Sequence, residues 1–111
     1  MAWLPYPCGA WFLGGAFLTN AVPHFVSGVM GRPFQSPFAK PRGEGLSSST
    51  VNVLWGFFNL AAGIALTDRL GSFDLHSTGD VLALGSSVLL SGLGLARLFG
   101  RFHGGNAPGE S

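Results

Sequence analysis

Three long stretches of this chain carry no charged residue: Met1–Gly31, Gly45–Thr67 and Val81–Ala96. A helix needs roughly 20 apolar residues to cross a hydrocarbon layer about 30 Å thick, and the first two stretches reach that length. The third is bordered by Asp80 and Arg97. An arginine at a helix end can run its stem along the helix and place its guanidinium among lipid headgroups. The sequence therefore predicts three membrane-spanning helices.

The composition agrees with a membrane protein. Of the 111 residues, 47% are hydrophobic and only 10% are charged, which is too few charges for the surface of an ordinary soluble domain. The formal net charge of +1 leaves no dense basic surface for nucleic acid, so we expect no nucleic-acid partner. We therefore expect one membrane domain over residues 1–111, with lipids as its first partners.

The predicted fold class is all-α, an integral membrane bundle of three transmembrane helices. We expect these helices at about residues 9–30, 50–70 and 78–100. A basic loop rich in proline and phenylalanine, residues 31–49, joins the first two, and residues 101–111 form a flexible tail.

Residues that favour helix ends occur at the predicted boundaries. Ser47, Ser48, Ser49 and Thr50 offer N-caps for the second helix, and Gly71 suits a left-handed residue after it. Ser77 and Asp80 have the spacing of a capping box at the start of the third helix.

The basic residues predict the orientation in the membrane. They are unevenly placed, with three in the first loop, two at the C-terminal end and one between the second and third helices: Arg32, Lys40, Arg42; Arg97, Arg101; Arg69. The positive-inside rule then places the first loop and the C-terminus in the cytoplasm and the N-terminus outside, in the cell inner (plasma) membrane. Trp3, Tyr6 and Trp11 would form an aromatic belt at the outer interface, and Trp55 would lie near the inner one.

The first loop alternates Phe34 and Phe38 with the cations Arg32, Lys40 and Arg42. This alternation suits a segment at the membrane surface, with rings toward the lipid and cations on anionic headgroups. The alternatives are an ordered connector whose phenylalanines pack under the bundle, which we favour, and a re-entrant loop that gates a substrate path.

Each predicted helix has one narrow stripe of small and polar residues. At 3.6 residues per turn, the stripes of the first two helices each span about 60° of the helix circumference. In chain order the stripes are Asn20, His24 and Ser27; Asn52, Gly56, Asn59 and Gly63; and Asp80, Ala83, Ser87, Ser91 and Gly94. Helices in lipid associate through close backbone approach and interhelical hydrogen bonds, so we expect the three stripes to face one another.

The stretch "LTNAVPHFVSGVM" holds the most polar part of the first stripe. Asn20 and His24 can avoid hydrocarbon only by bonding to a neighbouring helix, with Asn59 as a candidate partner. Pro23 removes the helical hydrogen bond to the carbonyl of Thr19, and Asn59 is also a candidate donor to that carbonyl.

Three functions are compatible with these residues. The leading hypothesis is a small non-enzymatic membrane protein that acts by helix association, as a homo-oligomer or as an accessory subunit of a larger complex. The alternative is a minimal oligomeric transporter or channel whose pathway His24, Asn20 and Asn59 line. A third hypothesis is a redox subunit in which His24 ligates haem, which would need a second histidine from another copy.

Other chemistry finds no support in the sequence. Cys8 is the single cysteine and cannot form an internal disulfide, and no cysteine and histidine spacing indicates a metal site. No pair of carboxylates or activated nucleophile suggests catalysis. The polar stripe Asn20, His24, Ser27, Asn52 and Asn59 is therefore the candidate site, as a structural seam or as a ligand or ion site.

Overall fold

The computed structural model describes residues 5–106, and the chain is mostly helical. The three long helices are α1 (Pro5–Val29), α2 (Ser49–Ile64) and α3 (Thr78–His103). A π-helical segment, η1 (Ala65–Leu70), follows α2 without a break. The prediction of three helices in these parts of the sequence is confirmed.

The helix bounds differ from the prediction at two ends. α1 begins at Pro5 rather than near residue 9, because prolines are tolerated in the first turn, where the N–H groups have no helical partner. α3 continues to His103 and ends at Gly104, whose φ of 71° is left-handed. The expected flexible tail therefore does not begin at residue 101, and residues 107–111 lie outside the described part of the chain.

The first loop is partly ordered as a hairpin, so the all-α prediction is wrong in this detail. The antiparallel strands β1 (Phe34–Gln35) and β2 (Leu46–Ser47) pair with each other. Ser36 organises the turn between them, because its carbonyl accepts from Gly43 N at 2.9 Å and its hydroxyl contacts the Ser47 hydroxyl. We refer to residues 30–48 as the hairpin loop.

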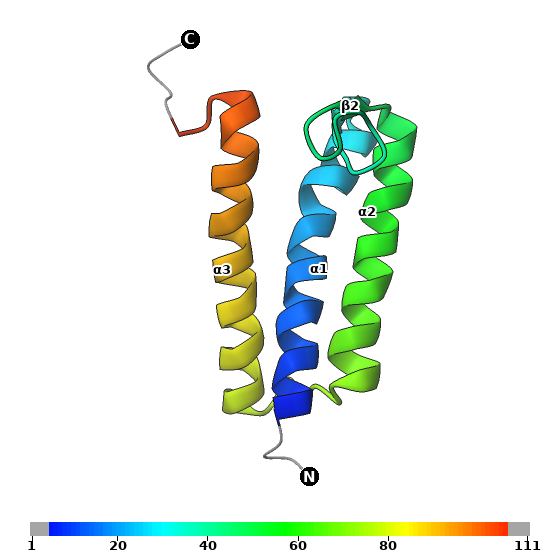
Figure 1. Ribbon diagram of the computed structural model, residues 1–111. Helices are drawn as coiled ribbons and strands as arrows, with labels where there is room; N and C mark the ends of the chain where they lie inside the picture. Colours follow the sequence, from blue (N-terminus) through cyan, green and yellow to red (C-terminus); the bar gives the residue numbers. More distant parts are fainter. Residues whose placement is uncertain (1–4, 107–111) are drawn as a thin grey trace.

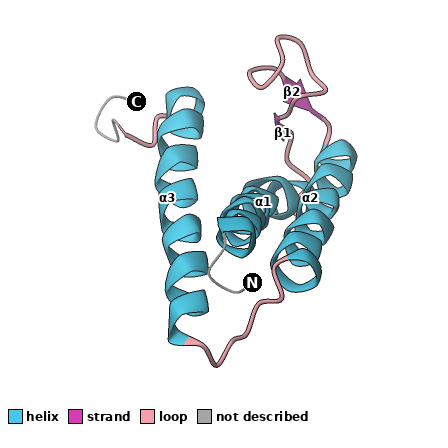
Figure 2. Ribbon diagram, turned by 60° about the horizontal axis from the view of Figure 1, so that its bottom comes forward, coloured by secondary structure: helices cyan, strands magenta, loops and turns pink. Residues whose placement is uncertain are grey.

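The helix α1 lies between α2 and α3 (Figures 1 and 2). Both outer helices pack extensively on α1 but not on each other. Two adjacent glycines make this possible, because consecutive helical residues point about 100° apart. A Cβ on Gly14 would collide with Thr67 of η1, which continues α2, whereas a Cβ on Gly15 would collide with Ser87 of α3.

The burial of side chains is the reverse of that in a soluble domain. The buried hydrophobic residues are few and the buried polar residues are more numerous: Ala10, Trp11 and Ala21 against His24, Gln35, Ser36, Asn52, Asn59, Thr67 and Ser87. Large apolar side chains are exposed on all three helices, for example Val22, Phe57 and Leu89.

Two helical segments are long and apolar enough to cross a membrane, Ser49–Leu70 and Thr78–His103. These are the two outer elements of the arrangement. Within the described residues α1 does not join them, and it is the helix that carries Asn20, Pro23 and His24. The helix that carries the buried His24 thus takes the central position, where it has helical neighbours on two sides.

The predicted N-caps are confirmed. Ser48 accepts from Val51 N at 3.2 Å at the start of α2. At the start of α3, Ser77 Oγ accepts from Asp80 N at 3.2 Å and donates to Asp80 Oδ1 at 3.1 Å.

Gly71 does not take the left-handed conformation that we predicted, since its φ is −89°. The residue with positive φ is Ser72, at 49°. Gly71 instead accommodates Trp11, whose indole N–H donates to the Gly71 carbonyl at 3.0 Å and whose ring a Cβ would strike. Trp11 is consequently 8% exposed and packs inside the chain, which contradicts its assignment to an aromatic belt. Trp3 and the side chain of Tyr6 lie outside the described part.

Candidate functional site

The stripe predicted for the second helix is the buried face of α2. Its buried residues are Asn52, Gly56, Asn59 and Gly63. This face packs on α1, where Asn20 and His24 each find one partner. The third stripe meets α1 mainly through Ser87, whose hydroxyl donates to the Phe12 carbonyl at 2.6 Å. The three stripes therefore do not converge on one axis as predicted, because α2 and α3 occupy different sides of α1.

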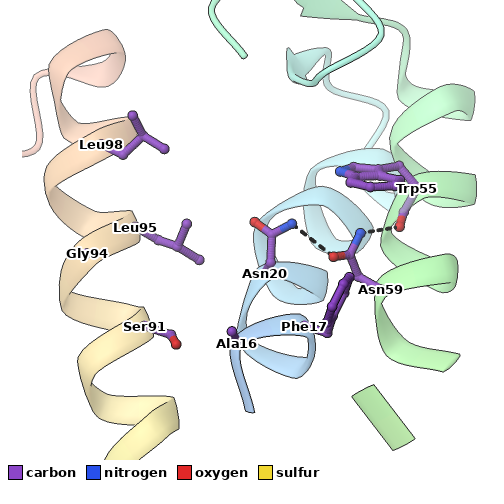
Figure 3. Close-up of a pocket in the computed structure, with 9 residues that line it drawn as sticks. All are labelled: Ala16, Phe17, Asn20, Trp55, Asn59, Ser91, Gly94, Leu95 and Leu98. Carbon is purple, nitrogen blue, oxygen red and sulfur yellow. Dashed lines mark hydrogen bonds between the residues drawn. The ribbon is translucent and has the colours of Figure 1, made fainter. Parts of the chain in front are cut away.

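Asn20 and Asn59 form the first polar pair between α1 and α2. Asn20 Nδ2 donates to Asn59 Oδ1 at 3.0 Å, and Asn59 Nδ2 donates to the Trp55 carbonyl at 2.7 Å. The carbonyl can only accept, which fixes the orientation of Asn59 and, in turn, that of Asn20. Asn20 Oδ1 is left pointing toward α3 (Figure 3). It makes no hydrogen bond within residues 5–106.

This geometry corrects one expectation for Asn59. Its amide donates within its own helix, to Trp55, and not to the carbonyl of Thr19 that Pro23 leaves without a helical donor.

Asn52 forms the second pair and joins three parts of the fold. Its Nδ2 lies 3.2 Å from the Phe34 carbonyl, 3.2 Å from the Ser47 carbonyl and 3.0 Å from the Ser48 carbonyl. Its Oδ1 lies 2.8 Å from His24 Nδ1. The three carbonyls orient the amide in the same way as for Asn59, so His24 Nδ1 must be the donor. The partner of His24 is thus Asn52 and not Asn59.

The donor role of Nδ1 leaves Nε2 of a neutral His24 as an acceptor. The imidazole of His24 is 2% exposed. It packs in T-shaped contacts against the rings of Phe34, Trp55 and Phe99, with centroid distances of 5.4, 6.3 and 5.9 Å. The ring of Phe34 also stacks on His103 at 5.1 Å. Phe34 therefore packs under the bundle, as the ordered-connector alternative expects, while Phe38 is 63% exposed and reaches Trp55 by its edge.

The remaining predicted site residues take no part in these pairs. Ser27 is half-buried and its side chain makes no hydrogen bond in the described region. Arg32, Lys40 and Arg42 are exposed at the hairpin end of the fold, where they are free to meet headgroups. That contact stays a prediction.

A groove runs between α2 and α3, with α1 as its floor (Figure 3). Its volume is about 570 Å³. The polar residues that border it are Asn20, Asn59 and Ser91, and Trp55, Leu95 and Leu98 form much of its hairpin end. We refer to this space as the lateral groove.

A smaller cavity of about 240 Å³ lies between the lateral groove and the hairpin loop. It shares Asn20, Trp55, Leu95 and Leu98 with the groove, and adds His24 and Gln35. Gln35 is 5% exposed, and its Oε1 lies 2.8 Å from His103 Nε2. We refer to this space as the polar cavity.

Sequence reasoning missed three residues of this region. Gln35 and Ser36 are in a loop, where no helical period indicates which side chains are buried. Trp55 was assigned to the membrane interface, yet its indole N–H is buried without an acceptor in the described structure. Its position one turn before Asn59 was the available signal.

Comparison with protein-family models, with curated proteins and with solved structures finds no match. Within residues 5–106, no group of three or more histidine, cysteine, aspartate or glutamate side chains could hold a metal ion. The interpretation of the site therefore depends on its geometry.

Proposed function

We propose that this chain is a non-enzymatic integral membrane protein of the cell inner membrane that acts by helix association, with further copies of itself or as an accessory subunit of a larger complex. The observation that supports this proposal is the reversed burial. Asn52, Asn59 and Ser87 are each at most 1% exposed, whereas Leu54, Leu82 and Leu89 are each more than 60% exposed. Apolar side chains that face hydrocarbon chains carry no free-energy penalty, whereas polar groups in lipid must find hydrogen-bond partners inside the protein.

The helix α3 is the part with the most surface left for association. Ser87 is its one buried residue within the described chain. A Cβ on Gly85 of this helix would meet no atom of the described residues within 4 Å. Small residues let a second helix approach closely in lipid, so the exposed face of α3 can accept a helix from another chain.

Association is tested by measuring the mass of the protein in mild detergent and in lipid nanodiscs. We expect the wild-type chain as an oligomer or in a stoichiometric larger complex. Gly85→Leu should shift the population roughly tenfold toward the single chain, because loss of close helix approach costs about 1–2 kcal/mol. The control Phe57→Leu on the exposed face of α2 should leave the mass unchanged. A wild-type chain that is monomeric at every protein-to-lipid ratio and co-purifies with nothing would contradict the proposal.

The proposed orientation places the hairpin loop and the C-terminal end of α3 in the cytoplasm. Cys8 is exposed near the start of α1 and serves as a natural reporter of the opposite end. In intact cells we expect a membrane-impermeant maleimide to label Cys8, and to label Leu75→Cys in a Cys8→Ser background. Arg42→Cys in that background should react only after lysis. Labelling of Arg42→Cys in intact cells, with no labelling at the other two positions, would invert the orientation.

A further inference from the structure

The lateral groove is open on the side where α2 and α3 face each other, because these helices do not pack together. In a membrane this opening faces lipid. Apolar side chains dominate the walls, and Ala16, Phe17 and Ser91 lie at the end away from the hairpin loop (Figure 3). The groove therefore suits a hydrocarbon chain.

The hairpin end of the groove holds one hydrogen-bond donor and one acceptor that residues 5–106 leave without a partner. The donor is Trp55 Nε1, which is buried without a partner. The acceptor is Asn20 Oδ1, which the chain of hydrogen bonds through Asn59 forces to point toward α3. Both residues border the groove and the polar cavity. The buried indole N–H without a partner is costly, and Asn20 Oδ1 faces the groove, so an occupant that supplies both missing bonds would be favoured.

A hydroxyl group is the simplest head that satisfies both residues, because it donates one hydrogen bond and accepts others. Among the described residues, no charged side chain lines either the groove or the polar cavity. A phosphate or a carboxylate would therefore be desolvated there without a counter-charge, which is strongly unfavourable.

The depth of the site agrees with a neutral head. Asn20 lies nine residues before Val29, the last residue of α1, which corresponds to roughly 14 Å along the helix axis. Half of the hydrocarbon layer is about 15 Å thick, so Asn20 is near the middle of the bilayer in the proposed location. A neutral hydroxyl is tolerated at that depth far better than an ionised headgroup.

We propose that the lateral groove and the polar cavity together bind one neutral, hydroxyl-bearing membrane lipid. Its chain lies between α2 and α3, and its hydroxyl donates to Asn20 Oδ1. A small rotation of the indole, whose Nε1 is buried in the described structure, lets the same hydroxyl accept from Trp55 Nε1. Both a diacylglycerol and a long-chain polyprenol carry this chemistry. This proposal rests on the membrane location proposed above, but not on the association.

The test uses the full chain in nanodiscs of phosphatidylcholine and phosphatidylglycerol that contain a diacylglycerol with a photoreactive diazirine in one acyl chain. We expect adducts on groove residues such as Phe17, Leu95 and Leu98. Unlabelled dioleoylglycerol or undecaprenol should compete, and the better competitor identifies the source of the lipid. The 3-O-methyl ether of dioleoylglycerol cannot donate to Asn20, so it should compete roughly tenfold less well.

Two matched variants keep the test independent of folding. Gly94→Leu fills the groove and should abolish the adducts, whereas Gly9→Leu adds the same side chain at an exposed glycine of α1 outside the groove and should keep them. Neither Cβ meets an atom of the described residues within 4 Å, so circular dichroism and melting temperature should match the wild type.

Equal competition by the methyl ether would overturn recognition of the hydroxyl, and stronger competition by phosphatidic acid would overturn the neutral head. Equal labelling of the two glycine variants, or labelling outside the groove, would overturn the site. The mass of the oligomer is measured on the same samples. If the lipid results fail while the oligomer mass is as expected, only the lipid site is overturned and the association proposal stands. Release of the protein from cell membranes by alkaline carbonate would overturn both.

Discussion

Asn52→Leu is expected to lower the free energy of unfolding by roughly 2–4 kcal/mol, the largest loss from any single polar side chain of the bundle. The substitution leaves His24 Nδ1–H without its acceptor and takes the amide donor from the carbonyls of Phe34 and Ser47. Two helices and the hairpin loop lose their common contact at once. Thermal unfolding in detergent measures the change.

The matched control for this prediction is Asn59→Leu, on the same face of α2. We expect a loss of about 1 kcal/mol, because Asn59 bonds only to Asn20 and to a carbonyl of its own helix. The double variant of His24→Phe with Asn52→Leu should be less harmful than the sum of the single variants, because neither polar group is then stranded. Strict additivity of these two changes, or equal losses for Asn52→Leu and Asn59→Leu, would contradict the assigned pairs.

Gly56→Ala is expected to cost about 2–3 kcal/mol, although it adds one methyl group. A Cβ on Gly56 would lie 2.5 Å from Phe25 N and 2.8 Å from Phe25 Cα. These are backbone atoms of α1, so no rotamer change relieves the collision and the two helices must separate. That separation would also weaken the polar pairs on either side of the glycine.

The melting temperature in detergent tests this effect, with Gly94→Ala as the control. Gly94 is also a glycine in a long helix, but its Cβ would meet nothing within 4 Å. Alanine has the higher helix propensity, so Gly94→Ala should be neutral or slightly stabilising. A similar change in melting temperature for the two variants would show that helix propensity, and not the approach of α1 and α2, determines the role of Gly56.

The helices and the buried face of α2 could be predicted because both depend on local periodicity. Charge-free stretches gave the helix positions, and the spacing of Asn52, Gly56, Asn59 and Gly63 gave the face that packs on α1. The N-caps Ser48 and Ser77 were predictable for the same reason, since a cap involves residues within one turn.

The pairing of side chains between helices could not be predicted from such patterns. A helical wheel places Asn20 and His24 on one face, but it holds no information on the axial offset between two helices. That offset decides that His24 meets Asn52 and that Asn20 meets Asn59. The side of α1 on which α3 packs could not be predicted either. The helical wheel suggested one packing face on α1, but the consecutive glycines Gly14 and Gly15 give it two.

The four groups bonded to the Asn52 side chain have an implication for biosynthesis. His24, Phe34, Ser47 and Ser48 all precede Asn52 in the chain. The complete set is therefore synthesised before any residue of α3, and N-terminal parts of a chain can assemble while translation continues. The helices α1 and α2 and the hairpin loop can thus pack together as one unit first. The helix α3 then packs on the surface of α1 that this unit leaves free. The order of elements along the gene matches the order in which their contacts can form.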